Sequence, residues 1–191
     1  KTLSKNANSN FVRKLYKTRD GSVFAGTNRG LFRLSDGNWV EEPGFNQKAI
    51  YAINEDSAGG LLVGTPGGLF STDKKPRLTG DVRAIADFQG RSYAAVFGTG
   101  VTGLENQPEV AQEAQMPTAL FAEADKLWIG TAKNGVFIFD GRETKQEKAL
   151  DSLRGAAIRK IIKDASNNYW FAGERGLFLY KDGNLENVIP N

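Results

Sequence analysis

The residues of this chain that are best suited to binding chemistry are arginines that follow a branched apolar residue. Arg13, Arg83 and Arg159 each follow a Val or Ile, and Tyr51 and Ala119 hold the corresponding place in two further copies of the pattern. A guanidinium group binds carboxylate, sulfate or phosphate through paired hydrogen bonds. Three guanidiniums around one axis would form a positively charged mouth for an anionic ligand. The alternative is that each arginine pairs locally or points into water, where ion pairs contribute little to stability.

Further polar side chains fall in turns that are expected to lie on the same face as these arginines. They are Asn28, Arg29, Lys133, Asn134, Glu174 and Arg175. Taken together, the candidate ligand-binding residues are Arg13, Tyr51, Arg83, Arg159, Arg29, Lys133 and Arg175.

The composition excludes most catalytic and metal chemistry. The chain has no histidine and no cysteine, which removes Ser-His-Asp and Cys-His catalysis, disulfides, and zinc sites built from these ligands. Glycosidases use paired carboxylates, but an aspartate that recurs in every copy of a repeat is more often a turn cap. Such aspartates occur at Asp20, Asp56, Asp87, Asp125 and Asp164. We therefore expect no catalytic residue, no metal and no cofactor, and a protein that is not an enzyme.

A glycine-rich segment offers a further candidate site. Gly98, Gly100 and Gly103 satisfy the G-x-G-x-x-G spacing, and they follow an expected strand, as a dinucleotide site requires. Such a site also needs a helix to begin directly afterwards, whereas Leu104 is followed by a segment that ends at Pro108. We interpret the glycines as a turn between two strands.

A short sequence motif, the recurring phrase, occurs five times and predicts the elements that position these residues. It consists of a large apolar residue, a pair of small residues, a polar turn, and Gly followed by Leu or Val. The large residues are Phe24, Leu62, Tyr93, Trp128 and Trp170, and the closing glycines are Gly30, Gly68, Gly100, Gly135 and Gly176. A period of roughly 40 residues built from short strands is typical of a propeller blade. We expect the large residues to pack between blades, the alternative being that they stack on sugars.

Apolar pairs three residues apart precede each phrase and mark a first strand. The pairs are Val12 and Leu15, Ile50 and Ile53, Val82 and Ile85, Thr118 and Phe121, and Ile158 and Ile161. In a propeller the first strand lines the central channel, which would place the arginines at its rim. The Asp-Gly pairs at 36–37, 140–141 and 182–183 suit tight hairpins.

The predicted fold is all-β, a β-propeller of five four-stranded antiparallel blades in one domain spanning 1–191. The blades are expected at about 5–40, 46–79, 80–112, 115–150 and 154–190. They form a closed five-bladed ring or a five-blade piece of a larger propeller. Residues 1–4 would supply a closing outer strand or the edge beside a missing blade. The segment 150–154 suits one helical turn, whereas 107–115 is bracketed by prolines and is expected to hold a strand.

These motifs resemble the two-component regulator propeller repeat. The match is close in the lead-in from Asn8 to Arg13 and in the strand Leu127-Trp128-Ile129-Gly130-Thr131. Ala95-Val96 and Ala172-Gly173 depart from the family's Gly-Thr pair. The resemblance implies a non-enzymatic sensor or interaction domain used in signal transduction, and it favours a periplasmic or extracellular location.

The partners that this sequence suits are an acidic small molecule, a saccharide or a protein. The 25 Lys and Arg residues face 22 Asp and Glu residues without a long block of one sign, so no nucleic acid is expected. No stretch approaches the roughly 18 apolar residues of a membrane helix, so no membrane contact is expected for this segment. Two other functions fit the same blades, a five-bladed carbohydrate-binding lectin and a protein–protein scaffold or assembly domain.

Overall fold

The computed structural model describes residues 11–73, 75–104 and 109–190. The expected closing strand at 1–4, the lead-in at 8–10 and the segment 105–108 lie outside the described residues. Contacts divide the chain into two compact units, Lys1–Ile85 and Ala86–Asn191, and each unit is described by itself.

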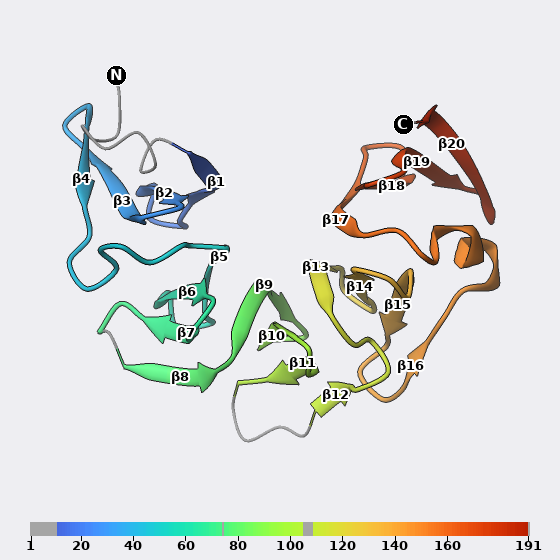
Figure 1. The fold of residues 1–191 in the computed structure, drawn as a ribbon, viewed down its shortest axis with the longest axis horizontal. Coiled ribbons are helices and arrows are strands. Elements are labelled where there is room, and N and C mark those ends of the chain that lie inside the picture. Colours follow the sequence, from blue (N-terminus) through green and yellow to red (C-terminus); the bar gives the residue numbers. More distant parts are fainter. Residues whose placement is uncertain (1–10, 74, 105–108, 191) are drawn as a thin grey trace. The chain divides into compact units, whose positions relative to one another are not determined.

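The first unit contains two four-stranded antiparallel sheets whose strands follow the chain in order (Figure 1). The first sheet consists of β1 (Val12–Lys17), β2 (Val23–Thr27), β3 (Gly30–Ser35) and β4 (Asn38–Glu41). The second consists of β5 (Ala52–Glu55), β6 (Leu61–Thr65), β7 (Gly68–Ser71) and β8 (Pro76–Thr79). Both are four-stranded and antiparallel, as expected of a blade.

The second unit contains three more sheets of the same kind. The third sheet consists of β9 (Asp81–Phe88), which begins in the first unit, β10 (Arg91–Phe97), β11 (Gly100–Gly103) and β12 (Glu109–Ala111). The fourth consists of β13 (Pro117–Ala122), β14 (Leu127–Thr131), β15 (Val136–Phe139) and β16 (Thr144–Lys145), and the fifth of β17 (Ile158–Lys163), β18 (Tyr169–Gly173), β19 (Gly176–Lys181) and β20 (Asn184–Pro190). The prediction of five four-stranded antiparallel sheets is confirmed.

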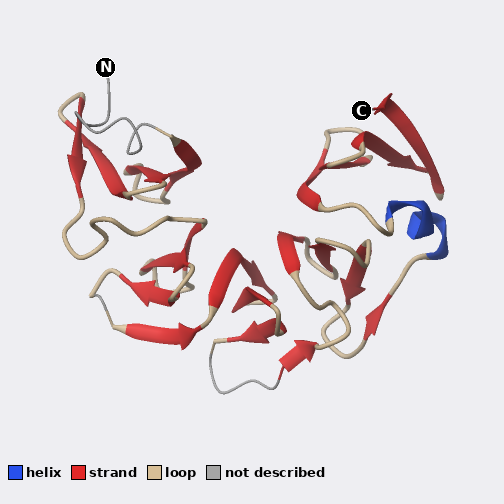
Figure 2. Ribbon diagram, in the orientation of Figure 1, coloured by secondary structure: helices blue, strands red, loops and turns tan. Residues whose placement is uncertain are grey.

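A short 3-10 helix, η2 (Lys148–Leu153), connects β16 to β17, where one helical turn was expected (Figure 2). It buries Leu150 and Leu153 against the fourth and fifth sheets. Within the part of the chain that the structure describes, no helix has the length and apolar character needed to cross a membrane.

The recurring Gly-Thr pair has two physical roles in these sheets. The glycine lets the next sheet approach closely: a Cβ built on Gly26 would lie 2.6 Å from Ile50 Cγ2, and one on Gly130 would lie 2.7 Å from Ile158 Cγ2. The buried threonine holds the following turn. The Thr27 hydroxyl donates to the Gly30 carbonyl at 3.0 Å and accepts from the Arg29 amide at 3.0 Å. Thr65 and Thr131 repeat this arrangement.

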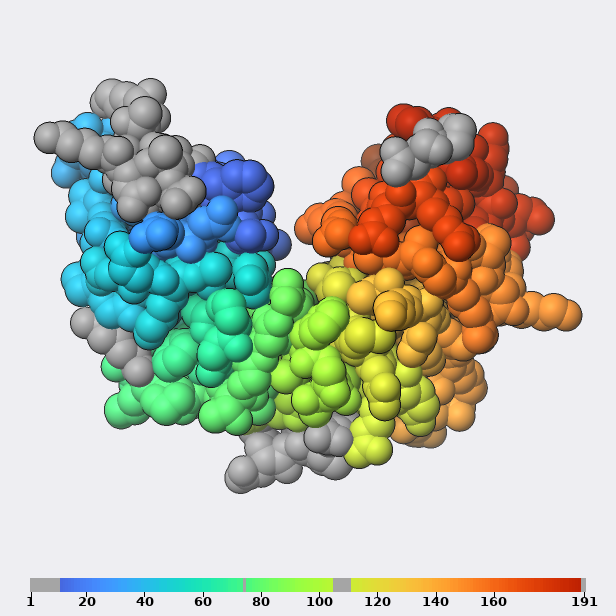
Figure 3. Space-filling view, viewed as in Figure 1, coloured from blue at the N-terminus to red at the C-terminus, as the bar shows by residue number. Residues whose placement is uncertain are grey.

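Consecutive sheets within a unit pack through apolar side chains and lie against one another in the space-filling view (Figure 3). We call the face that a sheet turns toward the next sheet its forward face. Phe24 and Leu31 on the forward face of the first sheet pack with Ile50 and Ile53 of the second. Trp128 likewise packs with residues of the fifth sheet.

The large residues of the recurring phrase are buried in the first four sheets, as expected for packing between blades. Trp170, in the fifth sheet, is only half-buried.

The fourth sheet corrects the predicted register of its first strand. Thr118 and Phe121 were expected to hold the apolar pair. Instead Pro117 pairs with Thr131 and Leu120 with Ile129, as Ile158 and Ile161 pair with Gly173 and Phe171 in the fifth sheet. The pair therefore begins one residue earlier, and Thr118 rather than Ala119 occupies the place of Arg159.

Candidate functional site

Three of the predicted binding residues meet in the first unit. Arg13 lies on β1, Tyr51 directly before β5, and Arg83 on β9. The guanidinium carbon of Arg83 lies 4.4 Å from the ring centre of Tyr51, and that of Arg13 lies 5.1 Å from it. The Tyr51 amide donates to the Gly64 carbonyl at 2.9 Å, which fixes the backbone beneath the ring. We call these three residues the Arg–Tyr–Arg cluster.

The two arginines of this cluster have side-chain partners of different charge. Arg83 forms an ion pair with Asp81 at 2.5 Å, and the Nε of Arg13 donates to the side-chain oxygen of Asn28, a neutral partner. Arg13 therefore forms no ion pair with a described residue, and the two guanidiniums lie beside the same tyrosine ring. Attraction to the ring of Tyr51 offsets part of the repulsion between them, and a bound anion would offset more.

Asp81 was not anticipated from the sequence. It stands two residues before Arg83 on the same strand, a spacing that places both side chains on one face of a sheet. Its second carboxylate oxygen, Oδ1, is buried and has no hydrogen-bond partner among the described residues. The strand periodicity was the signal that could have identified it.

The remaining candidates with side-chain partners pair with described residues other than those of the cluster. Arg29 donates to the Gln47 side chain at 2.6 Å. In the second unit, Arg159 pairs with Glu174 at 2.8 Å, and Arg175 donates to the Ser152 carbonyl at 3.3 Å. Lys133 is exposed. Local pairing, the alternative raised for the arginines, thus applies to Arg159 with Glu174 and also to Arg83 with Asp81.

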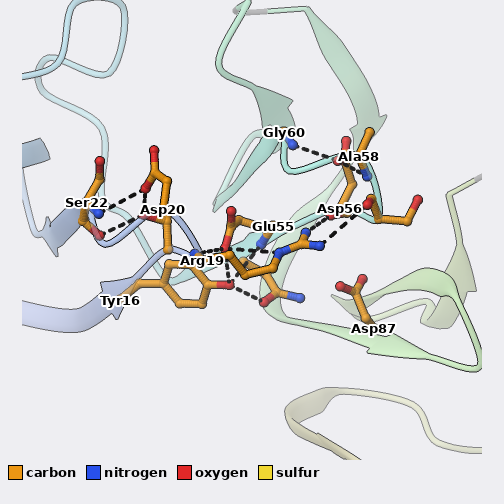
Figure 4. A network of polar contacts seen from close by, with 12 residues as sticks. Tyr16, Arg19, Asp20, Ser22, Glu55, Asp56, Ala58, Gly60 and Asp87 are labelled. Atoms are coloured by element: carbon orange, nitrogen blue, oxygen red, sulfur yellow. Dashed lines mark hydrogen bonds and ion pairs between the residues drawn. The ribbon is translucent and has the colours of Figure 1, made fainter.

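A second polar network lies at the other end of β5 and joins the first two sheets (Figure 4). Buried Glu55 accepts hydrogen bonds from the Tyr16 hydroxyl at 3.3 Å and from the Arg19 amide at 2.8 Å. The Arg19 guanidinium lies 3.6 Å from the same carboxylate and also donates to the Asp56 carbonyl. This carboxylate therefore bridges two sheets.

The second unit repeats this bridge. Glu123 of the fourth sheet accepts from Lys163 and from the Tyr169 hydroxyl of the fifth, both at 3.1 Å. Burial, followed by the neighbouring Glu123 carboxylate, raises the pKa of Tyr169. Sequence reasoning missed both bridges. A sequence signal was available. Glu55 stands five residues after Ile50 in the second sheet, and Glu123 stands six residues after Pro117 in the fourth.

Several of the recurring aspartates cap turns, as expected. Asp56 accepts from the amides of Ala58 and Gly60 at 3.0 and 2.7 Å, and Asp20 accepts from the Ser22 amide at 2.9 Å. Asp164 accepts from the Trp170 indole and the Asn168 amide, each at 2.9 Å, and these bonds lower its pKa to about 2. These carboxylates serve local structure.

The glycine-rich segment is a hairpin between β10 and β11, which confirms its interpretation as a turn. The Thr99 amide donates to the Val96 carbonyl at 3.0 Å. Gly100 has a φ of +138°, and a Cβ there would lie 2.7 Å from the Ala111 carbonyl oxygen. The glycine is thus explained by the turn and by the close approach of β12.

A cavity of about 400 Å³ lies beside β3 in the first unit. Its apolar lining includes Phe24, Leu31 and Phe45, and the Arg33–Glu42 ion pair, 2.8 Å long, forms a polar wall. Because all three apolar side chains are already buried, the cavity offers a ligand little apolar surface. The Arg–Tyr–Arg cluster is the stronger candidate.

The chain is similar in fold to β-propeller domains of known structure. The extracellular domain of BT4673 from B. thetaiotaomicron, described as a one-component system, matches with a TM-score of 0.71 and 16% identity, over 96% of this chain and 30% of that one. A second structure of the BT4673 extracellular domain, described as a hybrid two-component system, gives a TM-score of 0.60 and 14% identity, over 100% and 35%. The β-propeller domain of Myceliophteria thermophila Cps50 (Swd1) gives 0.61 and 16%, over 90% and 66%.

At these identities the likeness shows the fold: the five sheets are blades of the β-propeller type. The chain spans about a third of the length of the BT4673 domains that it matches. No protein-family model and no curated protein sequence matches it.

Proposed function

We propose that this chain is a non-enzymatic, ligand-binding sensor propeller and that the Arg–Tyr–Arg cluster binds an anionic ligand. The observation that carries the proposal is the pair of guanidiniums, 4.4 and 5.1 Å from one tyrosine ring, of which that of Arg13 forms no ion pair with a described residue. Charge-assisted bonds from arginine suit carboxylate, sulfate or phosphate. The ligand is an acidic small molecule or an acidic group on a saccharide or protein.

We infer the blade arrangement and the cellular location of this chain from its fold likeness and its repeat pattern. The five sheets are consecutive blades of one propeller, either a closed five-bladed ring or part of a larger one. The BT4673 domains are extracellular, and the two-component regulator propeller resemblance points the same way. We therefore place this chain in the periplasm or outside the cell, as the sensing part of a signalling protein.

Isothermal titration with matched ligands tests the proposal. The panel contains glucose, glucuronate, glucose 6-phosphate and inorganic sulfate. We expect the anions to bind and glucose to fail. Arg13→Met should weaken anion binding by about 10- to 100-fold, the equivalent of one charge-assisted hydrogen bond of 1.5–3 kcal/mol. Arg142→Met is the matched control, because Arg142 is an exposed arginine at a hairpin of the second unit, and it should bind like the parent.

Two results would overturn the proposal. Glucose that binds as well as glucuronate, with no effect of Arg13→Met, would favour the lectin alternative. Failure of the whole panel, including at low ionic strength where charge attraction is strongest, would leave the scaffold alternative.

A further inference from the structure

The forward face of the fifth sheet carries the residue pattern of a blade interface. Cross-strand pairs place Ile162 beside Trp170, Ala172 beside Leu177, and Leu177 beside Ile189. The fourth sheet has the same arrangement, with Phe121 beside Trp128 and Gly130 beside Val136. There the face is covered by the fifth sheet, whose Ile158 and Ile161 pack against Trp128 and Val136.

Among the described residues of its own unit, the fifth sheet has no such cover. Trp128 and Val136 are 2% exposed, whereas none of their counterparts in the fifth sheet is buried. Ile162 is 47% exposed and Ile189 is 58% exposed. We call Ile162, Trp170, Ala172, Leu177 and Ile189 the open face. Contiguous apolar surface of this kind marks an interaction site more often than chance exposure.

The first sheet carries the complementary half of the same interface. Val12 and Leu15 on β1 correspond to Ile50 and Ile53 of the second sheet and to Ile158 and Ile161 of the fifth. Those four isoleucines are 0–2% exposed, but Val12 is 42% and Leu15 63% exposed. Ala25 and Phe32, on the same side of the sheet, are buried, so the exposure is concentrated on β1. We call Val12 and Leu15 the open strip.

We infer that the open face of one copy of this chain binds the open strip of a second copy. The contact would reproduce between chains the junction that the fourth and fifth sheets make within one. Because the two surfaces differ, the contact is heterologous and runs head to tail. It goes beyond the proposed ligand site, and it gives the larger propeller of that proposal a source of further blades.

One electrostatic feature shapes this junction. Glu123 on the fourth sheet meets Lys163 on the fifth. At the new junction Asp164 holds the place of Glu123, and Lys17 of β1 holds the place of Lys163. Opposite charges at the rim attract most strongly at low ionic strength. We therefore expect added salt to weaken the assembly, as it weakens anion binding.

The test is native mass spectrometry and sedimentation of the 191-residue chain over a range of concentrations. We expect dimers or longer head-to-tail assemblies. Leu15→Asp places a charge on the open strip, and Ile162→Asp places one on the open face. Each substitution alone should shift the chain to the monomer. Both positions are exposed, so both variants should have the melting temperature that the parent shows at concentrations where it is monomeric. Val40→Asp, at another exposed apolar position, is the control and should assemble like the parent.

Mixing the two variants gives the decisive result. Leu15→Asp keeps an intact face and Ile162→Asp an intact strip, so an equimolar mixture should form one-to-one dimers that grow no further. The inference would be overturned if the parent chain is monomeric at every concentration. This holds whether the open face is covered within the chain or left uncovered. Assemblies that neither substitution disrupts would also overturn it.

Discussion

Replacing Gly130 by alanine probes the packing between consecutive blades directly. Its new Cβ would lie 2.7 Å from Ile158 Cγ2, 3.0 Å from Ile158 Cβ and 3.3 Å from Ala119 Cβ. A glycine-to-alanine change that fits its site stabilises a protein by about 0.4–1 kcal/mol. Overpacking a well-packed core instead costs about 1–3 kcal/mol. The contacts of 2.7 and 3.0 Å involve the branched part of a buried side chain. We therefore expect Gly130→Ala to lower the free energy of unfolding.

Chemical denaturation monitored by circular dichroism measures this loss, with about 2–4 °C of melting temperature per kcal/mol as a second readout for a chain of this size. Gly67→Ala is the control, because the nearest atom to its Cβ, Thr65 Oγ1, lies 3.9 Å away; it should be neutral or stabilising. Combining Gly130→Ala with Ile158→Ala removes the nearest clashing atom, Ile158 Cγ2, so the double variant should lose less than the sum of the singles. Equal stability of Gly130→Ala and Gly67→Ala would refute the packing argument.

Two further predictions follow from buried and hydrogen-bonded groups. Trp128→Ala should cost about 3–5 kcal/mol, the range for a large buried aromatic side chain, and Trp128→Phe should cost less, because the indole nitrogen has no partner among the described residues; a loss near zero for the alanine variant, measured by urea denaturation, would contradict burial between sheets. The pKa of Asp164 is lowered from 3.8 to about 2, so its stabilising contribution is present above about pH 4 and is lost as the pH falls from about 4 to about 2. Asp164→Asn should flatten the dependence of melting temperature on pH in that window, and an unchanged profile would count against the Asp164–Trp170 bond.

The fold was predictable because the same physical requirements recur in each blade. A close approach needs glycine at Gly26 and Gly130, and the next turn needs the threonine hydroxyl that follows. Asp36-Gly37 and Asp182-Gly183 adopt the positive φ angles that tight hairpins require. These constraints are local, so they are visible in the sequence.

The register of the fourth sheet was less predictable because pairing partners are not local. Thr118 is a better strand residue than Pro117, yet the proline occupies the first pairing position. A proline is tolerated at the first residue of a strand, where a missing amide costs little. Strand propensity alone therefore favoured the wrong residue.

The candidate site was predictable in residue type but not in grouping. Arg13, Arg83 and Arg159 are equivalent by repeat position, but Arg159 has Glu174 as a partner whereas Arg13 has the neutral Asn28. The partner comes from a turn in each case, and turn geometry decides which side chain is within reach. Only the structure distinguishes an arginine held by a carboxylate from one with a neutral partner.

Selenate, a heavier analogue of sulfate, tests the central claim most directly. Crystals of this chain soaked in selenate should show an anomalous peak within hydrogen-bonding distance of the Arg13 and Arg83 guanidiniums, beside the ring of Tyr51. The peak should be absent from crystals of Arg13→Met soaked in the same way. A peak at Arg159 or Arg175 with none at the Arg–Tyr–Arg cluster would contradict the assignment of this cluster as the anion site.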